Sequence, residues 1–163
     1  MATFKVYGPF AIPVIRGRGG RSIGDDLLVF WKDSGCEDKV GCYIFGIRQG
    51  GGTKPYYAGR TTKTFGSECF QAHKRVKYHK ALMSVTRGTP VMFFLAPVVA
   101  RGRVNAKSIK ELEQRLIGLS LKRNLEMTNI QGKSSDNLVI TGVMGSRGRP
   151  DDSASALRKT LGL

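Results

Sequence analysis

The stretch GCYIFGIRQGGGTKPYYAGRT, residues 41–61, places two apolar runs on either side of a glycine-rich segment. Both runs, CYIFGI and PYYAG, are rich in residues that favour strands, and the RQGGGTK between them is typical of a turn. The stretch therefore predicts a β-hairpin whose strands carry Tyr43 and Tyr57. Gly59 and Arg60 follow the second tyrosine directly.

The chain as a whole is strongly basic, with 27 Lys and Arg against 12 Asp and Glu, a formal charge of +15 over 163 residues. Such a charge repels itself unless a polyanion is near, so the leading partner is nucleic acid. No run approaches the length of a membrane-spanning helix, and the first residues lack a signal-peptide pattern. The three cysteines have no C-x-x-C spacing, so they favour a cytoplasmic protein without a disulfide framework or a zinc site.

Downstream of the hairpin the hydrophobic period changes to that of a helix. The pattern predicts one basic amphipathic helix over residues 65–83, with Lys74, Lys77 and Tyr78 facing away from the core. Its apolar stripe comprises Phe65, Cys69, Ala72, Val76 and Met83.

Three further segments have a recognisable character. The apolar run VMFFLAPVV at 91–99 predicts a buried strand. DDSASALRKTLGL at 151–163 predicts a closing helix that is capped by an aspartate and packs through Leu157 and Leu161. RGRGGRS at 16–22 fits either a phosphate-binding segment or a flexible loop.

Another helix is predicted to begin at Ser108, which forms an S-x-x-E capping box with Glu111. Within this helix Glu113 falls inside the apolar sector, on the row that joins Ile109 and Ile117. The other apolar members of the sector are Leu112, Leu116 and Leu119. Burying an unpaired carboxylate is costly, so Glu113 needs a salt bridge to a Lys or Arg, a cluster of donors, or a metal ion.

Four short motifs occur in order between residues 40 and 130. They are Gly41-Cys42-Tyr43, Tyr57-Ala58-Gly59, LEQRLI at 112–117 and RNLEMTN at 123–129. In this order they resemble the motifs of the GIY-YIG endonucleases, a family that includes incision enzymes of nucleotide-excision repair and certain homing and restriction endonucleases. The resemblance implies an α/β fold of the α+β type, with a central three-stranded antiparallel sheet flanked by helices.

The resemblance also implies limits for the domains. It places a nuclease domain at residues 41–130. Residues 1–40 would form an N-terminal extension packed on the core, and residues 131–163 a C-terminal extension with a short closing helix.

The chemistry that the resemblance implies centres on Glu113, which would bind Mg²⁺ or Mn²⁺. Magnesium suits a single carboxylate, because it keeps most of its waters and uses substrate phosphate oxygens as ligands. Tyr43 would act as general base, with its pKa lowered from about 10 by nearby cations such as Arg60 and Lys54. Tyr57 would orient the water or the phosphate. The remaining motif positions, which would be structural, are Gly41, Gly59 and Asn129.

One position departs from the family pattern. The family usually carries an arginine about two turns beyond the glycine of the second motif, but none occurs between Thr61 and Lys74. We expect Arg60 to clamp the phosphate and His73 to transfer a proton or position a group, although His73 also fits a partly buried helix position. The cations expected to bind DNA are Lys54, Lys74, Arg75, Lys77, Arg101 and Arg103.

The sequence thus predicts an endonuclease that hydrolyses phosphodiester bonds in DNA, with a glutamate-bound metal ion and a tyrosine-assisted water. The alternative is a catalytically impaired module of the same fold that binds nucleic acid. The charge alone also fits a general RNA-binding protein. The form of the substrate and the oligomeric state are left open by the sequence.

Overall fold

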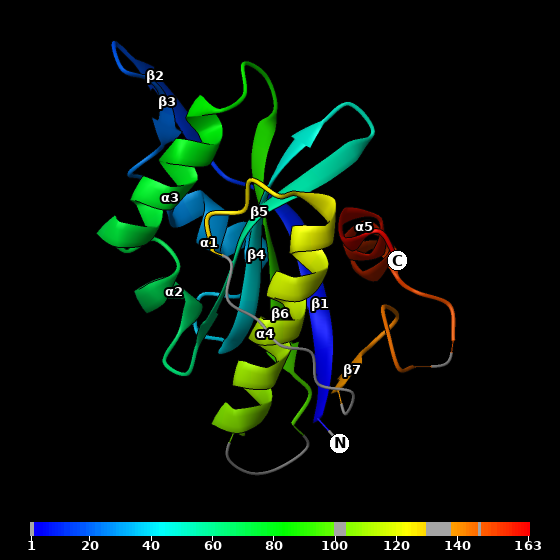
Figure 1. The fold of residues 1–163 in the computed structure, drawn as a ribbon. Coiled ribbons are helices and arrows are strands. Elements are labelled where there is room, and N and C mark those ends of the chain that lie inside the picture. Colours follow the sequence, from blue (N-terminus) through cyan, green and yellow to red (C-terminus); the bar gives the residue numbers. More distant parts are fainter. Residues whose placement is uncertain (1, 100–103, 130–137, 147) are drawn as a thin grey trace.

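The structure is a computed structural model, and it describes residues 2–99, 104–129, 138–146 and 148–163. One mixed sheet lies between two groups of helices (Figure 1). The elements, in chain order, are β1 (Ala2–Ala11), β2 (Val14–Gly17), β3 (Gly20–Ile23), α1 (Leu28–Ser34), β4 (Gly41–Gln49), β5 (Gly52–Thr61), α2 (Phe65–Glu68), α3 (Ala72–Met83), β6 (Thr89–Pro97), α4 (Ala106–Arg123), β7 (Leu138–Ile140) and α5 (Asp152–Leu161). Within the described residues, none of the helices is long and apolar enough to cross a membrane.

The predicted hairpin is confirmed as β4 and β5, which pair antiparallel with Tyr43 opposite Gly59. The α+β class is also confirmed, but the prediction of a three-stranded sheet is wrong. The sheet has five strands in the order β5-β4-β6-β1-β7, in which β1 pairs antiparallel with β6 and β7 runs parallel to β1. Residues 2–11, expected in an N-terminal extension, therefore supply a strand inside the sheet.

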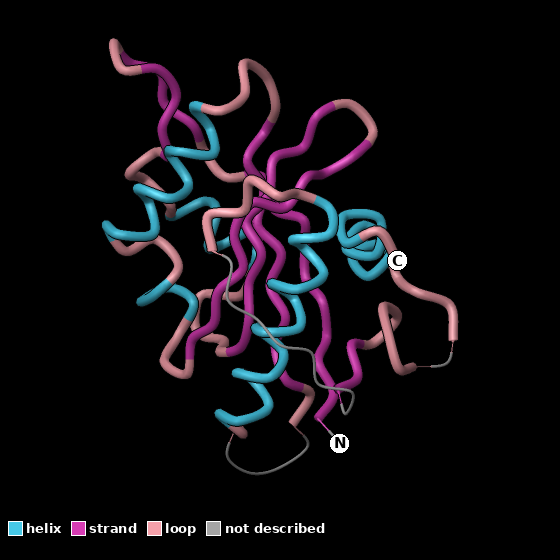
Figure 2. Tube along the Cα trace, in the orientation of Figure 1, coloured by secondary structure: helices cyan, strands magenta, loops and turns pink. Residues whose placement is uncertain are grey.

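Both faces of the sheet are covered by helices (Figure 2). Side chains alternate between the faces of a strand, so neighbouring residues of β4 enter different cores. Cys42 and Ile44 pack with α4 and α5. Tyr43 and Phe45 pack with α1, α2 and α3. Because both faces are buried, the strands are nearly continuous apolar runs, which is why 42–47 and 91–97 are so hydrophobic.

The single helix predicted over residues 65–83 is wrong, because the segment is broken into α2 and α3 at Cys69–Gln71. The break shifts the phase of the second part. Lys74 and Tyr78 are buried, whereas Val76 is 68% and Met83 57% exposed. Tyr78 stacks on Phe45, with 4.4 Å between the ring centroids, and this packing fixes the face that α3 turns to the sheet.

The start of α4 also differs from the prediction. The N-cap is Asn105, whose side-chain oxygen accepts from the backbone N–H groups of Lys107 and Ser108, so the capping box at Ser108 is wrong. The closing helix α5 is confirmed: Asp151 caps it, and Leu157 and Leu161 are buried. Most of the RGRGGRS segment is neither a loop nor disordered, because it forms the β2–β3 hairpin.

Candidate functional site

Residues from both cores meet around β5, the edge strand of the sheet. Arg60 of β5 donates through Nε to Oε2 of Glu113 on α4, at 2.8 Å. This ion pair lines two adjoining pockets, of about 310 and 470 Å³, which together we call the β5-edge groove. The smaller pocket also contains Thr61, Thr62, Lys63 and Glu68, and the larger contains Lys77, Lys110, Gln114, Ile117, Thr128 and Asn129. The groove thus joins α3 and α4 across the strand edge.

The sequence left three kinds of partner open for the Glu113 carboxylate. The structure shows one of them, an arginine that forms a salt bridge. The Glu113 side chain is nevertheless only 22% exposed. Burial raises the pKa of Glu113 above its ordinary value, and the opposing effects of Arg60, Lys74 and Lys110 do not fully compensate. The nearby cations therefore compensate only part of the cost of burying this charge. Such a carboxylate is suited to bind a further cation.

This balance predicts the effect of Glu113→Gln on stability. A carboxyl group with a raised pKa in the folded state favours folding below its ordinary pKa, and that contribution is lost as pH rises through the raised value. At pH 7 the carboxyl group is ionised, and burying its charge lowers the stability of the folded state. Glutamine carries no charge, so we expect the variant to have a free energy of unfolding at least as high as that of the wild type. Urea unfolding at pH 7 and pH 4 measures this. A variant clearly less stable at pH 7 would mean that the bridge to Arg60 outweighs the burial.

The structure corrects the expected chemistry of Tyr43. The residue is fully buried, and burial, followed by the neighbouring Tyr78, Cys69 and Tyr57, raises the pKa of its hydroxyl instead of lowering it. Its hydroxyl has no hydrogen-bond partner of ordinary geometry among the described residues. Lys54, expected to help lower this pKa, pairs with Glu126 at 3.7 Å.

The second tyrosine lies beside the first, with 6.0 Å between the ring centroids of Tyr43 and Tyr57. Burial also raises the pKa of Tyr57. Cations lie over both rings: Lys74 Nζ is 5.4 Å from the Tyr43 centroid, and Lys77 Nζ is 5.1 Å from the Tyr57 centroid. Gly59 is required here, because a Cβ would lie 2.5 Å from the Tyr43 hydroxyl. The glycine two residues after Tyr57 thus leaves space for the phenol group of Tyr43.

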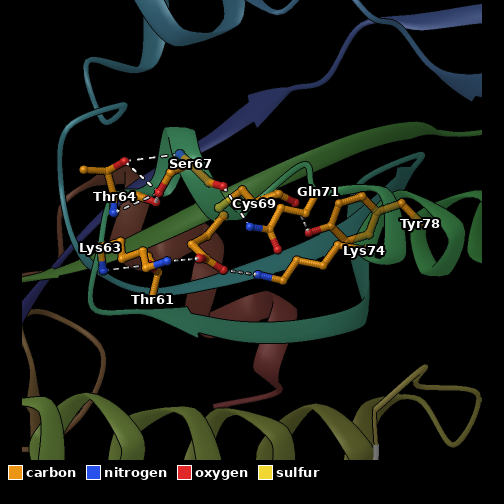
Figure 3. Close-up of polar contacts among 9 residues, drawn as sticks. Thr61, Lys63, Thr64, Ser67, Cys69, Gln71, Lys74 and Tyr78 are labelled. Carbon is orange, nitrogen blue, oxygen red and sulfur yellow. Dashed lines mark hydrogen bonds and ion pairs between the residues drawn. The ribbon is translucent and has the colours of Figure 1, made fainter.

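Sequence reasoning missed Glu68, the carboxylate of α2 that lies in the groove. Figure 3 shows this segment. Oε2 of Glu68 is 3.2 Å from Nζ of Lys74, which is only 6% exposed, and Oε1 is 4.0 Å from Nζ of Lys63. A lysine is seldom buried unless its ammonium group is paired, and Glu68 supplies that partner. The broken helix concealed it, because a continuous helix over 65–83 would turn Lys74 to the solvent.

A local hydrogen-bond network fixes α2 in place. The Thr64 hydroxyl accepts from the Ser67 backbone N–H at 3.2 Å, and the Ser67 hydroxyl accepts from the Thr64 N–H at 3.3 Å, so the two residues form a capping box (Figure 3). At the other end, the Tyr78 hydroxyl donates to the Cys69 carbonyl at 2.7 Å. These contacts position Glu68 and are signalled in the sequence only by the T-x-x-S pattern.

The remaining predicted residues lie elsewhere. Arg75 donates to the carbonyls of Phe70 and Gly24 and pairs with Asp25, so it holds loops together on the side of α3 away from the groove. His73 is exposed and does not line the groove. Two of the predicted DNA-binding cations, Arg101 and Arg103, lie outside the described residues.

The segment after α4 runs along the outer edge of β5. The Asn129 side chain accepts from the Ala58 N–H at 3.2 Å and donates to the Ala58 carbonyl. The Asn124 amide donates to the Pro55 carbonyl at 2.8 Å, and the Thr128 N–H donates to the Tyr56 carbonyl at 2.8 Å. The predicted motif asparagine therefore completes the backbone hydrogen bonding of the strand that carries Tyr57 and Arg60.

Asn129→Ala should lower the free energy of unfolding by about 1–2 kcal/mol, because it leaves a partly buried N–H and C=O of Ala58 without partners. Urea denaturation measures the change. Thr128→Val is the matched control and should cost less, because the Tyr56 carbonyl keeps the backbone N–H of residue 128. Equal losses in the two variants would contradict this role for Asn129.

The chemistry of the donors is compatible with Mg²⁺ or Mn²⁺. Two carboxylates, Glu68 and Glu113, line the smaller pocket. Magnesium often takes one or two protein carboxylates and completes its shell with water and phosphate oxygens. Among the described residues, no group of three or more His, Cys, Asp or Glu is close enough to enclose a metal ion by itself.

Comparison with known proteins gives no match: no family model, no curated protein and no solved structure is significantly similar to this chain.

Proposed function

We propose that the chain is a metal-dependent endonuclease acting on DNA, with the β5-edge groove as its active site. The observation that carries the proposal is the meeting at one strand edge, beside Tyr57, of Arg60 on β5 and Glu113 on α4, which are 53 residues apart in the sequence. Phosphodiester hydrolysis needs a cation site, donors for the phosphate and a positioned water. The +15 charge of the chain suits a polyanionic substrate.

In this proposal Glu113 would hold the metal ion, and Glu68 is a second carboxylate that lines the same pocket. The bound ion would stabilise the charge that develops on the scissile phosphate and on the leaving oxygen. Arg60, which is paired with Glu113 in this structure, would bind a phosphate oxygen. Tyr57 orients the phosphate or the attacking water. Because burial raises its pKa, Tyr43 would stay a neutral phenol and would not act as the base.

Lys74 is our candidate for the cationic role of the absent helix arginine. It comes from the helix that follows the second motif, and it lies over the Tyr43 ring. Its ion pair with Glu68 compensates the cost of burying the ammonium and restricts where it can point. A preorganised cation of this kind stabilises transition-state charge more effectively than a flexible surface lysine.

One observation favours the alternative, a module that binds nucleic acid without cleaving it. Arg60 and Glu113 are engaged with each other at 2.8 Å, so the two groups needed for metal and phosphate binding satisfy one another. In such a module the groove would still contact the phosphate backbone through Lys77 and Lys110.

The test is a cleavage assay with the purified protein on supercoiled, linear, single-stranded and branched DNA, in Mg²⁺, Mn²⁺ or EDTA. We expect nicking or cutting of at least one substrate in the presence of metal and none in EDTA. Tight, salt-sensitive binding without cleavage of any substrate would overturn the nuclease and leave the binding module.

A further inference from the structure

The β2–β3 hairpin, residues 14–23, is separate from the main sheet. We call it the arm. Its two strands pair antiparallel from Val14 opposite Ile23 to Gly17 opposite Gly20. The arm projects from the body of the molecule at the C-terminal end of α3 (Figures 1 and 2). The β5-edge groove does not include it.

The arm is anchored to the body at two points, one close to its tip and one at its base. Arg21 donates from Nη1 to the Gly88 carbonyl at 2.6 Å and from Nη2 to the Val85 carbonyl at 3.1 Å. The Gly24 N–H donates to the Pro13 carbonyl at 2.8 Å and closes the hairpin. A segment that is already ordered loses little conformational entropy on binding, so the arm is preorganised for a partner.

Two of the three arginines of the arm have no partner among the described residues. Arg16 lies directly opposite Arg21 on the two strands, and like charges in such positions destabilise a hairpin. The charge of Arg21 is compensated by its hydrogen bonds to two carbonyl groups. Arg16 and Arg18 are exposed and make no ion pair or hydrogen bond with a described residue. An external anion would remove this repulsion.

The shape of the arm favours one kind of anion. Gly20 packs against Met83, but at Gly17 and Gly19 an added Cβ would meet no other atom within 4 Å, so the other side of the tip is open. A two-stranded ribbon fits the major groove of B-form DNA, which is about 12 Å wide. The deep, narrow major groove of A-form RNA does not admit it, and a single strand has no groove.

We infer that the arm binds the groove of double-stranded DNA, with Arg16 and Arg18 contacting phosphates or base edges. The inference deepens the proposed function by naming the form of the DNA, and it rests on DNA binding and not on cleavage.

Helix α3 links the arm to the groove. Lys77 lines the groove, and Met83, six residues further on, contacts the arm beside Gly20. Six residues of helix span about 9 Å, less than one turn of duplex DNA. Along the helix axis the groove and the arm therefore lie within one turn of a duplex of each other.

The experiment measures binding by fluorescence anisotropy in EDTA, so that cleavage plays no part. The probes are a labelled DNA duplex, one of its single strands and an RNA duplex of the same sequence. The variant is Arg16→Ala/Arg18→Ala, and the control is Lys122→Ala/Lys159→Ala, which removes two exposed charges on the opposite face of the sheet. Circular dichroism and the midpoint of thermal unfolding establish that both variants fold.

We expect the arm variant to lose roughly tenfold or more in affinity for duplex DNA, and much less for the other two probes. The slope of log affinity against log salt should fall by about 1.8, which corresponds to two phosphate contacts. The inference is overturned if the arm variant binds duplex DNA like the control, or loses equal affinity for all three probes. A protein that shows the arm effect but cleaves nothing would disprove the nuclease alone.

Discussion

Glu113→Gln should reduce metal-dependent DNA cleavage by about 10³-fold or more, while DNA binding in EDTA stays within a few-fold of the wild type. Glutamine keeps the size of the side chain but removes the negative charge that a hard cation requires. It also ends the ion pair with Arg60, which then remains available to a phosphate. Loss of cleavage with retained binding therefore separates a metal ligand from a general contact to DNA.

The matched control is Glu111→Gln, two residues earlier on α4. Successive side chains of a helix are about 100° apart, so residue 111 points well away from residue 113 and does not line the groove. The control should cleave at the wild-type rate. Equal loss in both variants would indicate a general effect of charge, and full activity of Glu113→Gln would remove this residue from the proposed mechanism.

Gly41→Ala should lower the free energy of unfolding by about 3 kcal/mol or more. Gly41 has φ +140°, a conformation that residues with a Cβ rarely adopt, and an added Cβ would lie 2.0 Å from the carbonyl oxygen of Leu95 on β6. The clash is with backbone, so no side-chain rotation relieves it. The pairing of β4 with β6 next to Tyr43 would have to shift.

Urea denaturation with Gly51→Ala as control measures this effect. Gly51 lies in the turn between β4 and β5, where an added Cβ meets no other atom within 4 Å. The control should change stability by a few tenths of a kcal/mol at most. If Gly41→Ala were as stable as the control, the close approach at Leu95 would not constrain the fold.

The hairpin could be predicted because its signal is local. Two β-forming runs around three glycines determine the β4–β5 pair without help from the rest of the chain, and the asparagine after α4 was found by its motif. The apolar run of β6 is also a local signal, whereas β1 and β7 depend on distant contacts. β7 has only three residues, too few for a periodic pattern, and it pairs with residues of β1 that are more than 130 positions away in the sequence.

The errors within the site have a common physical cause. A helical pattern over residues 65–83 assumes one continuous helix, and the break at Cys69–Gln71 rotates all that follows. The prediction therefore placed Lys74 in the solvent, whereas the structure buries it. For the same reason its partner Glu68 was not predicted as a site residue. The pKa of Tyr43 was misjudged for a similar reason. Nearby cations were visible in the sequence, but the full burial of the ring, which dominates the shift, was not.

The asparagine and threonine contacts along β5 also bear on how copies of this protein behave together. An unpaired edge strand is a template on which another chain can add a strand, and this is a common route to aggregation. Here the side chains of Asn124 and Asn129 and the backbone of Thr128 occupy carbonyls or N–H groups that an incoming strand would use. The segment that shapes the groove thereby hinders strand addition at this edge, which favours a protein that stays dispersed at high concentration.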